Sequence, residues 1–332
     1  SFEQHEEKLR QLIEKSNQQH IVADVPISYS LSGGIDSTVL VSERSNKYPK
    51  QTLNTFSIFS EDKKIDEKKW VNEIINNSNN IVNFSSIPKL QNFLDDLEKI
   101  IWTLDEPPCD STIYSEWLVY KMISNKNYKV TISGQGADEI FGGYHNYFFS
   151  YLLFLLSKFK FILFFRELSK LNSIHNYQKT YIYRGLLSKV IPEFFFKIKS
   201  KFIKNSNPLF ALKKTKSYKL DKNFQREKLV GIKNLSIFQI KSSMLPKLLR
   251  YADRLSMKHS LEVRVPYLDH DLVEFTLGIP DNKKIKNGIT KHILRESCKE
   301  FLPNKIYNRL DKIGFEVASK KWITNKEQNI KL

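Results

Sequence analysis

The sequence predicts an α/β protein with a doubly wound parallel sheet and a helical C-terminal part. Over the first 145 residues, segments patterned as strands alternate with amphipathic helical segments, which is typical of parallel strands joined by right-handed crossovers. Two of the strands run directly into glycine-rich turns that carry carboxylates, at 32–37 and 134–144. Since ligands bind at the carboxyl ends of such strands, we expect both turns at one edge of the sheet.

The individual elements follow from local patterns. Phe2, Leu9, Leu12 and Ile13 share one face of an N-terminal amphipathic helix, and Pro88 favours the first turn of a later one. Alternating or buried-type apolar segments predict the strands. We expect strands at 27–31, 52–60, 80–87 and 128–133, and helices at 2–20, 35–46, 66–76, 88–104 and 112–124.

Three parts are expected within the chain: a sheet core at 21–145, a helical insert at 146–235 and a helical part at 236–332 that completes the site. The insert contains a 19-residue apolar segment, 147–165, interrupted by Lys158 and Lys160. Its apolar residues favour a membrane by about −6 kcal/mol, and the two lysines cancel this. We therefore favour a helical subdomain beside the site over a membrane span, with membrane-surface attachment as the weaker alternative. The lysine-rich residues 197–225 are expected to form a poorly ordered connector.

Composition limits the class of protein. The chain has 332 residues, enough for a large core, and a formal net charge of +17, which suits anionic partners. It has no dense basic block and no RNA-binding aromatic motif, so we expect no nucleic-acid partner. Its two cysteines, Cys109 and Cys298, form no CxxC or Cys/His cluster, which indicates a reducing, cytoplasmic environment without structural disulfides or zinc.

The first glycine turn, in the segment ISYSLSGGIDSTVL at 27–40, is the strongest candidate site. Gly33 and Gly34 lack Cβ atoms and let backbone N–H groups at a helix start approach an oxyanion, while Ser32 and Ser37 add hydroxyl donors. Asp36 fits beside phosphates if it holds Mg²⁺ between them. The alternative is an ordinary strand-to-helix turn with Asp36 as a helix cap.

The second turn has the same order of strand, glycine and carboxylate, in SGQGADEIFGGY at 133–144. If both strands belong to one parallel sheet, Asp36 and Asp138 emerge at the same edge and can share a metal. Helix capping by Asp138 and Glu139 is the alternative, worth about 0.5 to 2 kcal/mol. It does not explain four glycines within ten residues.

The pair SGGIDS and SGQGADEIFGGY resembles the synthetase domain of glutamine-dependent asparagine synthetases, in the PP-loop branch of the adenine-nucleotide α hydrolases. The resemblance covers nearly the whole chain and is weakest between residues 146 and 235. Further matching segments are YADR at 251–254, EVRVPYLD at 262–269, KHILR at 291–295 and KIGF at 312–315.

This resemblance implies ATP and Mg²⁺ as cofactors, because family members adenylate a carboxylate, release pyrophosphate and let ammonia displace AMP. Mg²⁺ would be held by Asp36 and Asp138, and Lys291 would neutralise charge that develops at phosphorus. An ordinary surface lysine is the alternative for Lys291. Pyrophosphate contacts are expected from Ser32, Gly33, Gly34, Asp36 and Ser37, and contacts around adenine and ribose from Leu31, Ile58, Ser133 and Gly134.

One position departs from the family pattern. Asparagine-forming members carry Glu between the two glycines of the second turn, where this chain has Gln135. A Gln cannot transfer protons, although it can orient ammonia or a carboxylate. The identity of the substrate, aspartate or another carboxylate, is therefore left open by this position. Glu262 is a candidate substitute acid/base, and its alternative is a structural salt bridge with Arg264.

The expected partners are ammonia and a small-molecule carboxylate, most readily aspartate. The resemblance also predicts that the chain is a fragment, with a glutaminase domain before Ser1 in the full protein; a homodimer stays open. Neither Cys109 nor Cys298 is placed to replace a glutaminase nucleophile, so the chain alone should use ammonium salts rather than glutamine. Alternatives are a related ligase or cyclase acting on a sugar or peptide carboxylate, a tRNA-modifying ATP pyrophosphatase, and a non-catalytic binding protein.

Overall fold

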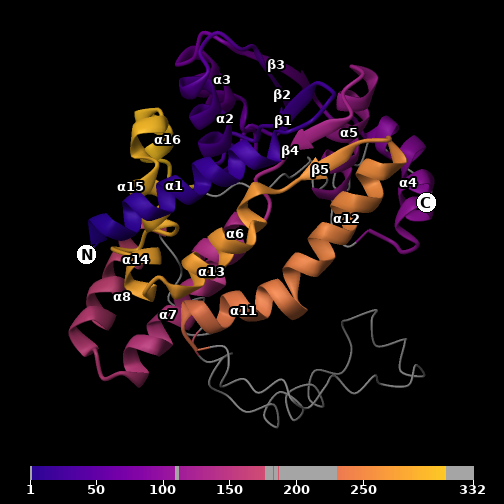
Figure 1. Cartoon of the computed structure of the whole chain (residues 1–332). Helices are drawn as coiled ribbons and strands as arrows, with labels where there is room; N and C mark the ends of the chain where they lie inside the picture. Colours follow the sequence, from indigo (N-terminus) through magenta and orange to yellow (C-terminus); the bar gives the residue numbers. More distant parts are fainter. Residues whose placement is uncertain (1, 109–111, 176–181, 183–185, 187–229, 312–332) are drawn as a thin grey trace, which may run out of the picture.

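The structure is a computed structural model and describes residues 2–108, 112–175, 182, 186 and 230–311 (Figure 1). Three sequence predictions lie outside these residues: the connector at 197–225, the role of Cys109 and the KIGF motif at 312–315.

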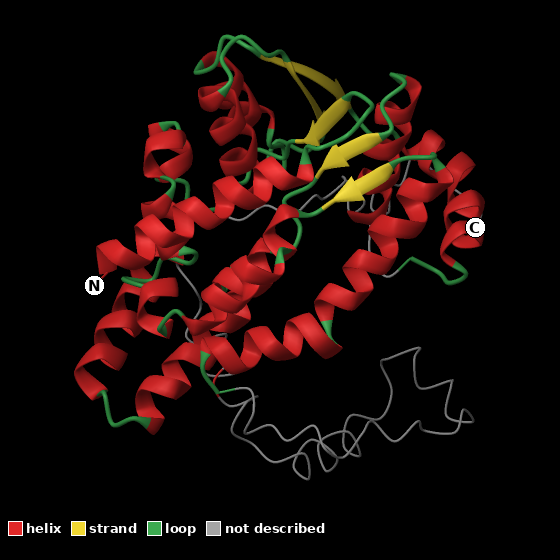
Figure 2. Ribbon diagram, viewed as in Figure 1, coloured by secondary structure: helices red, strands yellow, loops and turns green. Residues whose placement is uncertain are grey.

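Five parallel strands form a single sheet in the order β3-β2-β1-β4-β5 (Figure 2). In the centre, Tyr29 is in register with Thr55 on one side and Ile132 on the other. The sheet therefore brings the carboxyl ends of β1 and β4 next to each other, as the two glycine turns predicted. The strands are β1 (Ile27–Ser30), β2 (Leu53–Ile58), β3 (Ile81–Ser86), β4 (Val130–Ile132) and β5 (Glu262–Arg264).

Helices cover both faces of the sheet, which confirms the doubly wound α/β class. One apolar core lies between the sheet and α1 to α3 and includes Leu9, Val39 and Val71. A second core on the other face contains Phe56 of β2, Trp117 of α5 and Leu255 of α12. These helices are α1 (Phe2–His20), α2 (Ile35–Lys47), α3 (Lys68–Asn76), α4 (Leu90–Leu104), α5 (Thr112–Asn125) and α12 (Met244–Lys258).

Strand β5 was missed by the sequence prediction, which expected only helices after residue 236. It pairs in parallel with β4, and the backbone N–H of Glu262 donates to the carbonyl of Lys129 at 2.8 Å. Three residues at a sheet edge carry no alternating pattern, so neighbouring residues rather than local propensity define this strand. The core at 21–145 and the part at 236–332 consequently share one sheet.

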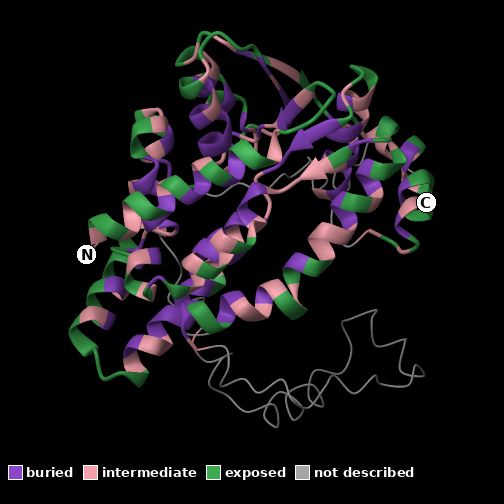
Figure 3. Cartoon of the chain, viewed as in Figure 1, coloured by how far each residue is buried: buried purple, intermediate pink, exposed green. Residues whose placement is uncertain are grey.

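The apolar segment at 147–165 folds as two helices, α7 and α8, that pack side by side around a third core including Phe148, Phe164 and Ile285. Within the described part of the chain, no helix is long and apolar enough to cross a membrane. Buried residues concentrate in the central strands β1, β2 and β4 and on the inner faces of the helices (Figure 3). The remaining elements are α6 (Ala137–Phe141), α7 (His145–Ser157), α8 (Phe161–His175), α11 (Ile232–Ser242), η3 (Pro266–Leu268), α13 (His270–Gly278), α14 (Asp281–Lys284), α15 (His292–Ser297), η4 (Lys299–Phe301) and α16 (Asn304–Tyr307).

Candidate functional site

Lys291 joins the two glycine turns. Its Nζ lies 2.7 and 2.6 Å from the two carboxylate oxygens of Asp36 and 2.7 Å from Oδ1 of Asp138. Asp36 is in the first turn of α2, Asp138 is in the first turn of α6, and Lys291 immediately precedes α15. The fold thus brings together three charged side chains that the sequence analysis had placed in one site.

The lysine is charged in this setting. Its side chain is buried, with 5% of the residue surface exposed. Burial alone would lower the pKa of Lys291, but Asp138 and Asp36 outweigh this effect and raise the pKa above its ordinary value. Lys291 is therefore an ammonium group at neutral pH where it contacts the two carboxyl groups.

Two glycines make this meeting possible. A Cβ on Gly134 would lie 3.0 Å from the backbone nitrogen of Ser37 and 3.2 Å from Cβ of Asp36, so the two turns touch through their backbones. A Cβ on Gly143 would lie 1.8 Å from Oδ1 of Asp138 and 2.2 Å from Cε of Lys291. A side chain at position 143 would occupy the space in which the ion pair forms.

The first turn is held from outside by Arg309, a residue that the sequence analysis missed. Its Nη1 donates to the carbonyl of Gly33 at 2.8 Å, and its Nη2 donates to Oε1 of Glu67 at 2.8 Å. Gly33 has φ +76°, and a Cβ there would lie 2.8 Å from Cβ of Trp70. The Arg309 guanidinium also lies 4.9 Å from the centroid of the Trp70 ring. The only sequence signal for Arg309 was its place three residues before the KIGF motif.

Arg309 and Glu67 are both buried. Burial raises the pKa of the Glu67 carboxyl, and the Arg309 guanidinium works against this rise. A second support comes from Tyr267, in the VPYLD segment, whose hydroxyl donates to the backbone carbonyl of Asp36 at 3.0 Å. The conformation of the first turn therefore depends on residues from α3 and from the last third of the chain.

The second turn is held by its own neighbours. The backbone N–H of Gly143 donates to the carbonyl of Asp138 at 2.8 Å. Buried Glu139 accepts a hydrogen bond from the hydroxyl of Tyr144 at 2.7 Å through Oε1, and its backbone carbonyl accepts one from the hydroxyl of Tyr147 at 2.9 Å. Glu139 is thus a buried carboxylate that helps to hold the second turn, and it also lines the cavity over the two turns.

A cavity of about 250 Å³ opens over the two turns. Its wall carries three cations, Lys291, Arg295 and Arg309, and six carboxylates, Asp36, Glu67, Glu116, Asp138, Glu139 and Asp311, so an anionic ligand fits there together with a metal cation. The predicted site residues that line it are Ser32, Gly34, Asp36, Ser37, Ser133, Gly134, Gln135, Asp138 and Lys291.

Gln135 faces a carboxylate in this cavity. Its Nε2 donates to Oε1 of Glu116, on α5, at 3.0 Å. A carboxylate accepts but does not donate hydrogen bonds, so it fixes which end of the Gln135 amide faces it. Glu116 also lines the cavity, and nothing in its helical sequence context marked it as a site residue.

The structure does not bring five of the discussed residues to the cavity wall. Gly33 is one of them, because it packs against Trp70 and its carbonyl accepts from Arg309. Leu31 and Ile58 lie in the two apolar cores beside the sheet. Glu262 is exposed at the start of β5, away from the carboxyl edge, and its Oε1 accepts from Nε of Arg264 at 2.6 Å, which is the salt bridge considered as its alternative. Cys298 is buried in the first core, and burial raises the pKa of its thiol.

The donor set fits Mg²⁺ bound together with phosphates. The Lys291 ammonium lies where the carboxylates of Asp36 and Asp138 converge, so this position already accommodates a cation. Among the described residues, no group of three or more His, Cys, Asp or Glu side chains could hold a metal ion. Two carboxylates without a full protein cage are what Mg²⁺ uses when waters and substrate phosphates complete its shell.

The parallel sheet and its first turn define a PP-loop α/β protein. Residues 8–330 match the family model described as asparagine synthase, and the chain belongs to this family. It is 30% identical to "Asparagine synthetase [glutamine-hydrolyzing] 1" of Bacillus subtilis, over 96% of this chain and 50% of that protein. It is 27% identical to "Asparagine synthetase [glutamine-hydrolyzing] 3" of the same organism, over 93% and 48%.

A fungal relative carries a different name. "Amidase chry2" of Gibberella zeae is 23% identical over 86% of this chain and 48% of that protein. The chain thus spans about half the length of the curated relatives it matches.

Proposed function

We propose that this chain is the synthetase unit of an ATP-dependent amidotransferase, which adenylates a carboxylate, releases pyrophosphate and forms an amide with ammonia. The observation that supports this most strongly is the Lys291 ammonium held between Asp36 and Asp138 at the wall of the cavity over the two glycine turns. Membership of the asparagine synthase family supports the same reaction class. The reaction needs preorganised positive charge at phosphorus and at the leaving pyrophosphate, and this cavity carries such charge.

In this proposal, each turn has one task. The backbone of Gly33 and Gly34, with the hydroxyls of Ser32 and Ser37, binds the β- and γ-phosphates that leave as pyrophosphate. Asp36 and Asp138 would hold Mg²⁺, which screens the phosphates from one another and polarises the P–O bonds when it is bound. Lys291 then turns from the carboxylates to the phosphate oxygens, where negative charge increases in the transition state.

The acceptor is proposed to be aspartate, in line with the names of the relatives. The pair of Gln135 and Glu116 favours a second candidate, an amidotransferase for another carboxylate, because this pair sets the hydrogen-bonding character of one cavity wall. Gln135 positions groups without moving a proton, and the proposal assigns no acid/base role to Glu262.

Ammonia is proposed to come from a glutaminase domain of the full-length protein. This rests on the words "glutamine-hydrolyzing" in the relatives' names and on the share of their length that this chain spans. We propose a cytoplasmic location, because the two cysteines form no CxxC or Cys/His cluster. With ammonium salts as the nitrogen source, activity should rise with pH as NH₃ replaces NH₄⁺, whereas glutamine should support no amide formation by residues 1–332 alone.

The experiment is ATP–pyrophosphate exchange with a panel of acids, since exchange requires only adenylation. We expect exchange with one acid of the panel and its loss by about 100-fold or more in Lys291→Met, with kcat and kcat/KM falling together. Lys15→Met, which removes an exposed lysine of α1, is the matched control and should behave as wild type. Exchange with none of the acids, or a Lys291→Met variant with only a raised KM for ATP, would contradict the proposal.

A further inference from the structure

Four large apolar side chains are exposed within seven residues at the turn between α7 and α8. Phe159 is 80% exposed, Phe161 50%, Ile162 87% and Phe165 64%. We call these four residues the hairpin-tip patch. Elsewhere in the described part of the chain, exposed large apolar side chains occur singly or in sequence pairs, such as Ile101 with Trp102. A concentration of this kind on a protein surface typically marks an interaction site.

The patch lies on the outer side of a helix that already buries its inner side. Phe164, Glu167 and Leu171 of α8 are buried, and Phe164 and Leu171 pack in the core shared with α7. Phe161 and Phe165 are four residues apart and therefore neighbours on the helix surface. Phe159 extends this surface, because its ring centroid lies 6.2 Å from that of Phe161. The first five residues of α8, FILFF at 161–165, are apolar on every side of the helix, and such a segment is normally enclosed, whereas this one is not.

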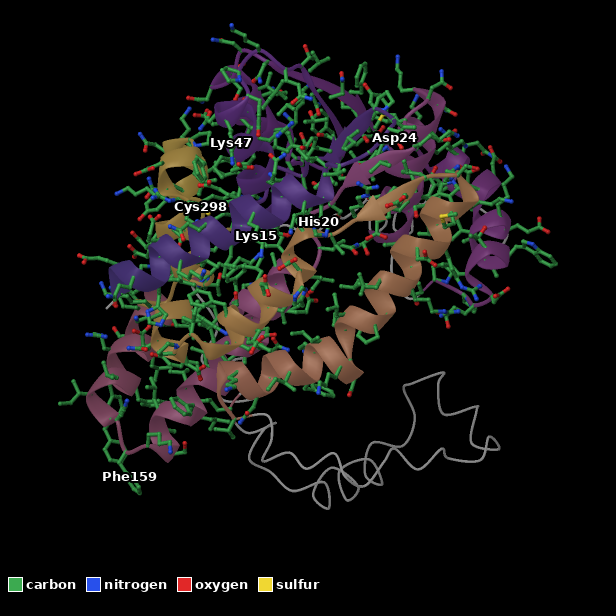
Figure 4. The ribbon with its side chains drawn as sticks, in the orientation of Figure 1. Lys15, His20, Asp24, Lys47, Phe159 and Cys298 are labelled. Atoms are coloured by element: carbon green, nitrogen blue, oxygen red, sulfur yellow. The ribbon has the colours of Figure 1, made fainter. Side chains whose placement is uncertain are left out.

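The conformation of Phe159 shows that folding does not account for its side chain. The residue ends α7 with φ +56°, its backbone N–H donates to the carbonyl of Leu156 at 3.0 Å, and the next N–H donates to Leu155 at 2.9 Å. This is the left-handed helix-ending position at which glycine is usual. A phenylalanine there strains the backbone and buries little surface, and its side chain projects from the hairpin tip (Figure 4).

The exposed charges around the patch are cationic. Lys158, Lys160 and Lys170 are exposed, and Arg166 is about half exposed at 3.7 Å from Glu167. The sole acidic residue of α7 and α8 is Glu167. It is buried, and its carboxylate accepts from the backbone N–H groups of residues 287 and 288 at 3.1 and 3.0 Å. The surface therefore combines an apolar tip with a positive rim.

We propose that the hairpin-tip patch binds the surface of an anionic membrane. Phe159, Ile162 and Phe165 enter the boundary between headgroups and acyl chains, and the lysines contact lipid phosphates. Protein interfaces are depleted of lysine, so a ring of lysines around exposed aromatic residues favours lipid over a protein partner. The inference concerns where the protein acts and is independent of the reaction proposed for the cavity.

The test is co-sedimentation of the full-length protein with vesicles of phosphatidylcholine alone and with about one third phosphatidylglycerol. We expect binding to the anionic vesicles, weakened by salt, and about tenfold weaker binding for the double variant Phe159→Asn with Ile162→Ser. Asparagine tolerates the left-handed conformation, so the thermal midpoint of this variant should equal or exceed that of wild type. Lys158→Ala with Lys160→Ala should reduce binding to anionic vesicles selectively.

Trp102→Ser is the matched control, because Trp102 is 81% exposed on α4. This helix lies at the opposite edge of the view in Figure 1 from α7 and α8. It should leave vesicle binding unchanged. Absence of binding to anionic vesicles, or equal binding by all variants, would overturn the proposal. If light scattering instead shows an oligomer that the double variant disrupts, without vesicle binding, the patch is a protein interface and the membrane proposal is wrong.

Discussion

The two glycine turns have the same order of strand, glycine and carboxylate, yet they are supported in different ways. In the second turn, Asp138 and Glu139 accept hydrogen bonds from residues within ten positions, namely Gly143, Tyr144 and Tyr147. The first turn has local hydrogen bonds among Ser32, Gly34 and Ser37, and two of its backbone carbonyls also accept from Arg309 and Tyr267, which are 276 and 231 positions away. Similar sequence motifs can thus differ in how strongly they depend on the rest of the fold.

This difference has a consequence for assembly of the site. The second turn also has distant contacts, because Gly136 packs against Leu268 and the backbone N–H of Ser133 donates to the carbonyl of Arg264 at 2.8 Å. In the first turn, the carbonyl of Gly33 gains its side-chain donor only when the C-terminal part has docked, because that donor is Arg309. Lys291, which bridges the turns, also comes from that part. Phosphate binding is therefore coupled to docking of the C-terminal part.

The largest effect is expected for Arg309→Met. It leaves Glu67 buried without its partner and frees the carbonyl of Gly33, so we expect the free energy of unfolding to fall by about 3–5 kcal/mol in urea titrations. Lys305→Met is a matched control: it removes an exposed ion pair with Glu73 between the same two regions and should cost less than about 1 kcal/mol.

A double variant separates the contribution of Arg309 to stability from its role in positioning the first turn. Glu67→Gln combined with Arg309→Met removes the buried charge as well, so part of the stability should return. The KM for ATP should stay raised, because the carbonyl of Gly33 still lacks its donor. Recovery of both stability and KM would show that Arg309 does not position the first turn.

Gly143→Ala, a substitution in the second turn, should have the next largest effect on stability. The added methyl group overlaps with Asp138 and Lys291, so we expect about 1–3 kcal/mol of destabilisation and loss of ATP–pyrophosphate exchange. The control is Gly278→Ala at the end of α13, where a Cβ meets no atom within 4 Å and stability should change little or rise. Wild-type exchange by Gly143→Ala would refute the close approach seen here.

Tyr144→Phe and Tyr267→Phe each remove one hydroxyl that donates a hydrogen bond to a glycine turn, Tyr144 to the second turn and Tyr267 to the first. Tyr144→Phe removes a hydroxyl donor from buried Glu139 and should cost about 2 kcal/mol, whereas Tyr267→Phe removes the hydroxyl donor of one backbone carbonyl and should cost about 1 kcal/mol. Thermal and urea unfolding measure both. If Tyr144→Phe were the milder change, the second turn would not depend on the hydrogen bond to Glu139.

The smallest expected effect is a loss of stability at acidic pH that depends on His259. Burial, with Lys121 acting in the same direction, lowers the pKa of His259 from 6.5 to about 4. The unfolded chain then binds the proton at a higher pH than the folded chain, so stability should decrease as pH falls from about 6.5 to 4. His259 packs edge-on against Trp117 at 4.4 Å between α12 and β5. His259→Gln should flatten the pH dependence of the thermal midpoint in this range, and an unchanged slope would contradict this assignment.

The sequence predicted the sheet, the two turns and the bridging residues because these features carry local signals. Glycine next to a strand end and a carboxylate in the following helix turn indicate their own conformations. Lys291 was placed by its motif, and the structure brings it to both carboxylates. The family resemblance was confirmed as well.

Other features depend on contacts between distant residues and left no local signal. The edge strand β5 is defined by β4, and Arg309 is recognisable only once the carbonyl of Gly33 and the carboxylate of Glu67 lie beside it. The family resemblance implied contacts of Leu31 and Ile58 with adenine and ribose, and the structure places both side chains in the apolar cores beside the sheet. Glu262 lies at the first residue of β5, whereas the cavity lies at the carboxyl ends of the strands.

The most direct measurement of the central claim is a double-mutant cycle on Mg²⁺-dependent ATP affinity. Asp36→Asn and Asp138→Asn each remove one carboxylate from the group around Lys291. If the two turns act as one phosphate- and metal-binding unit, either change alone should remove most of the Mg²⁺ dependence, and the double variant should bind hardly more weakly than the worse single variant. Additive losses in the double variant would contradict the claim that the turns share one site.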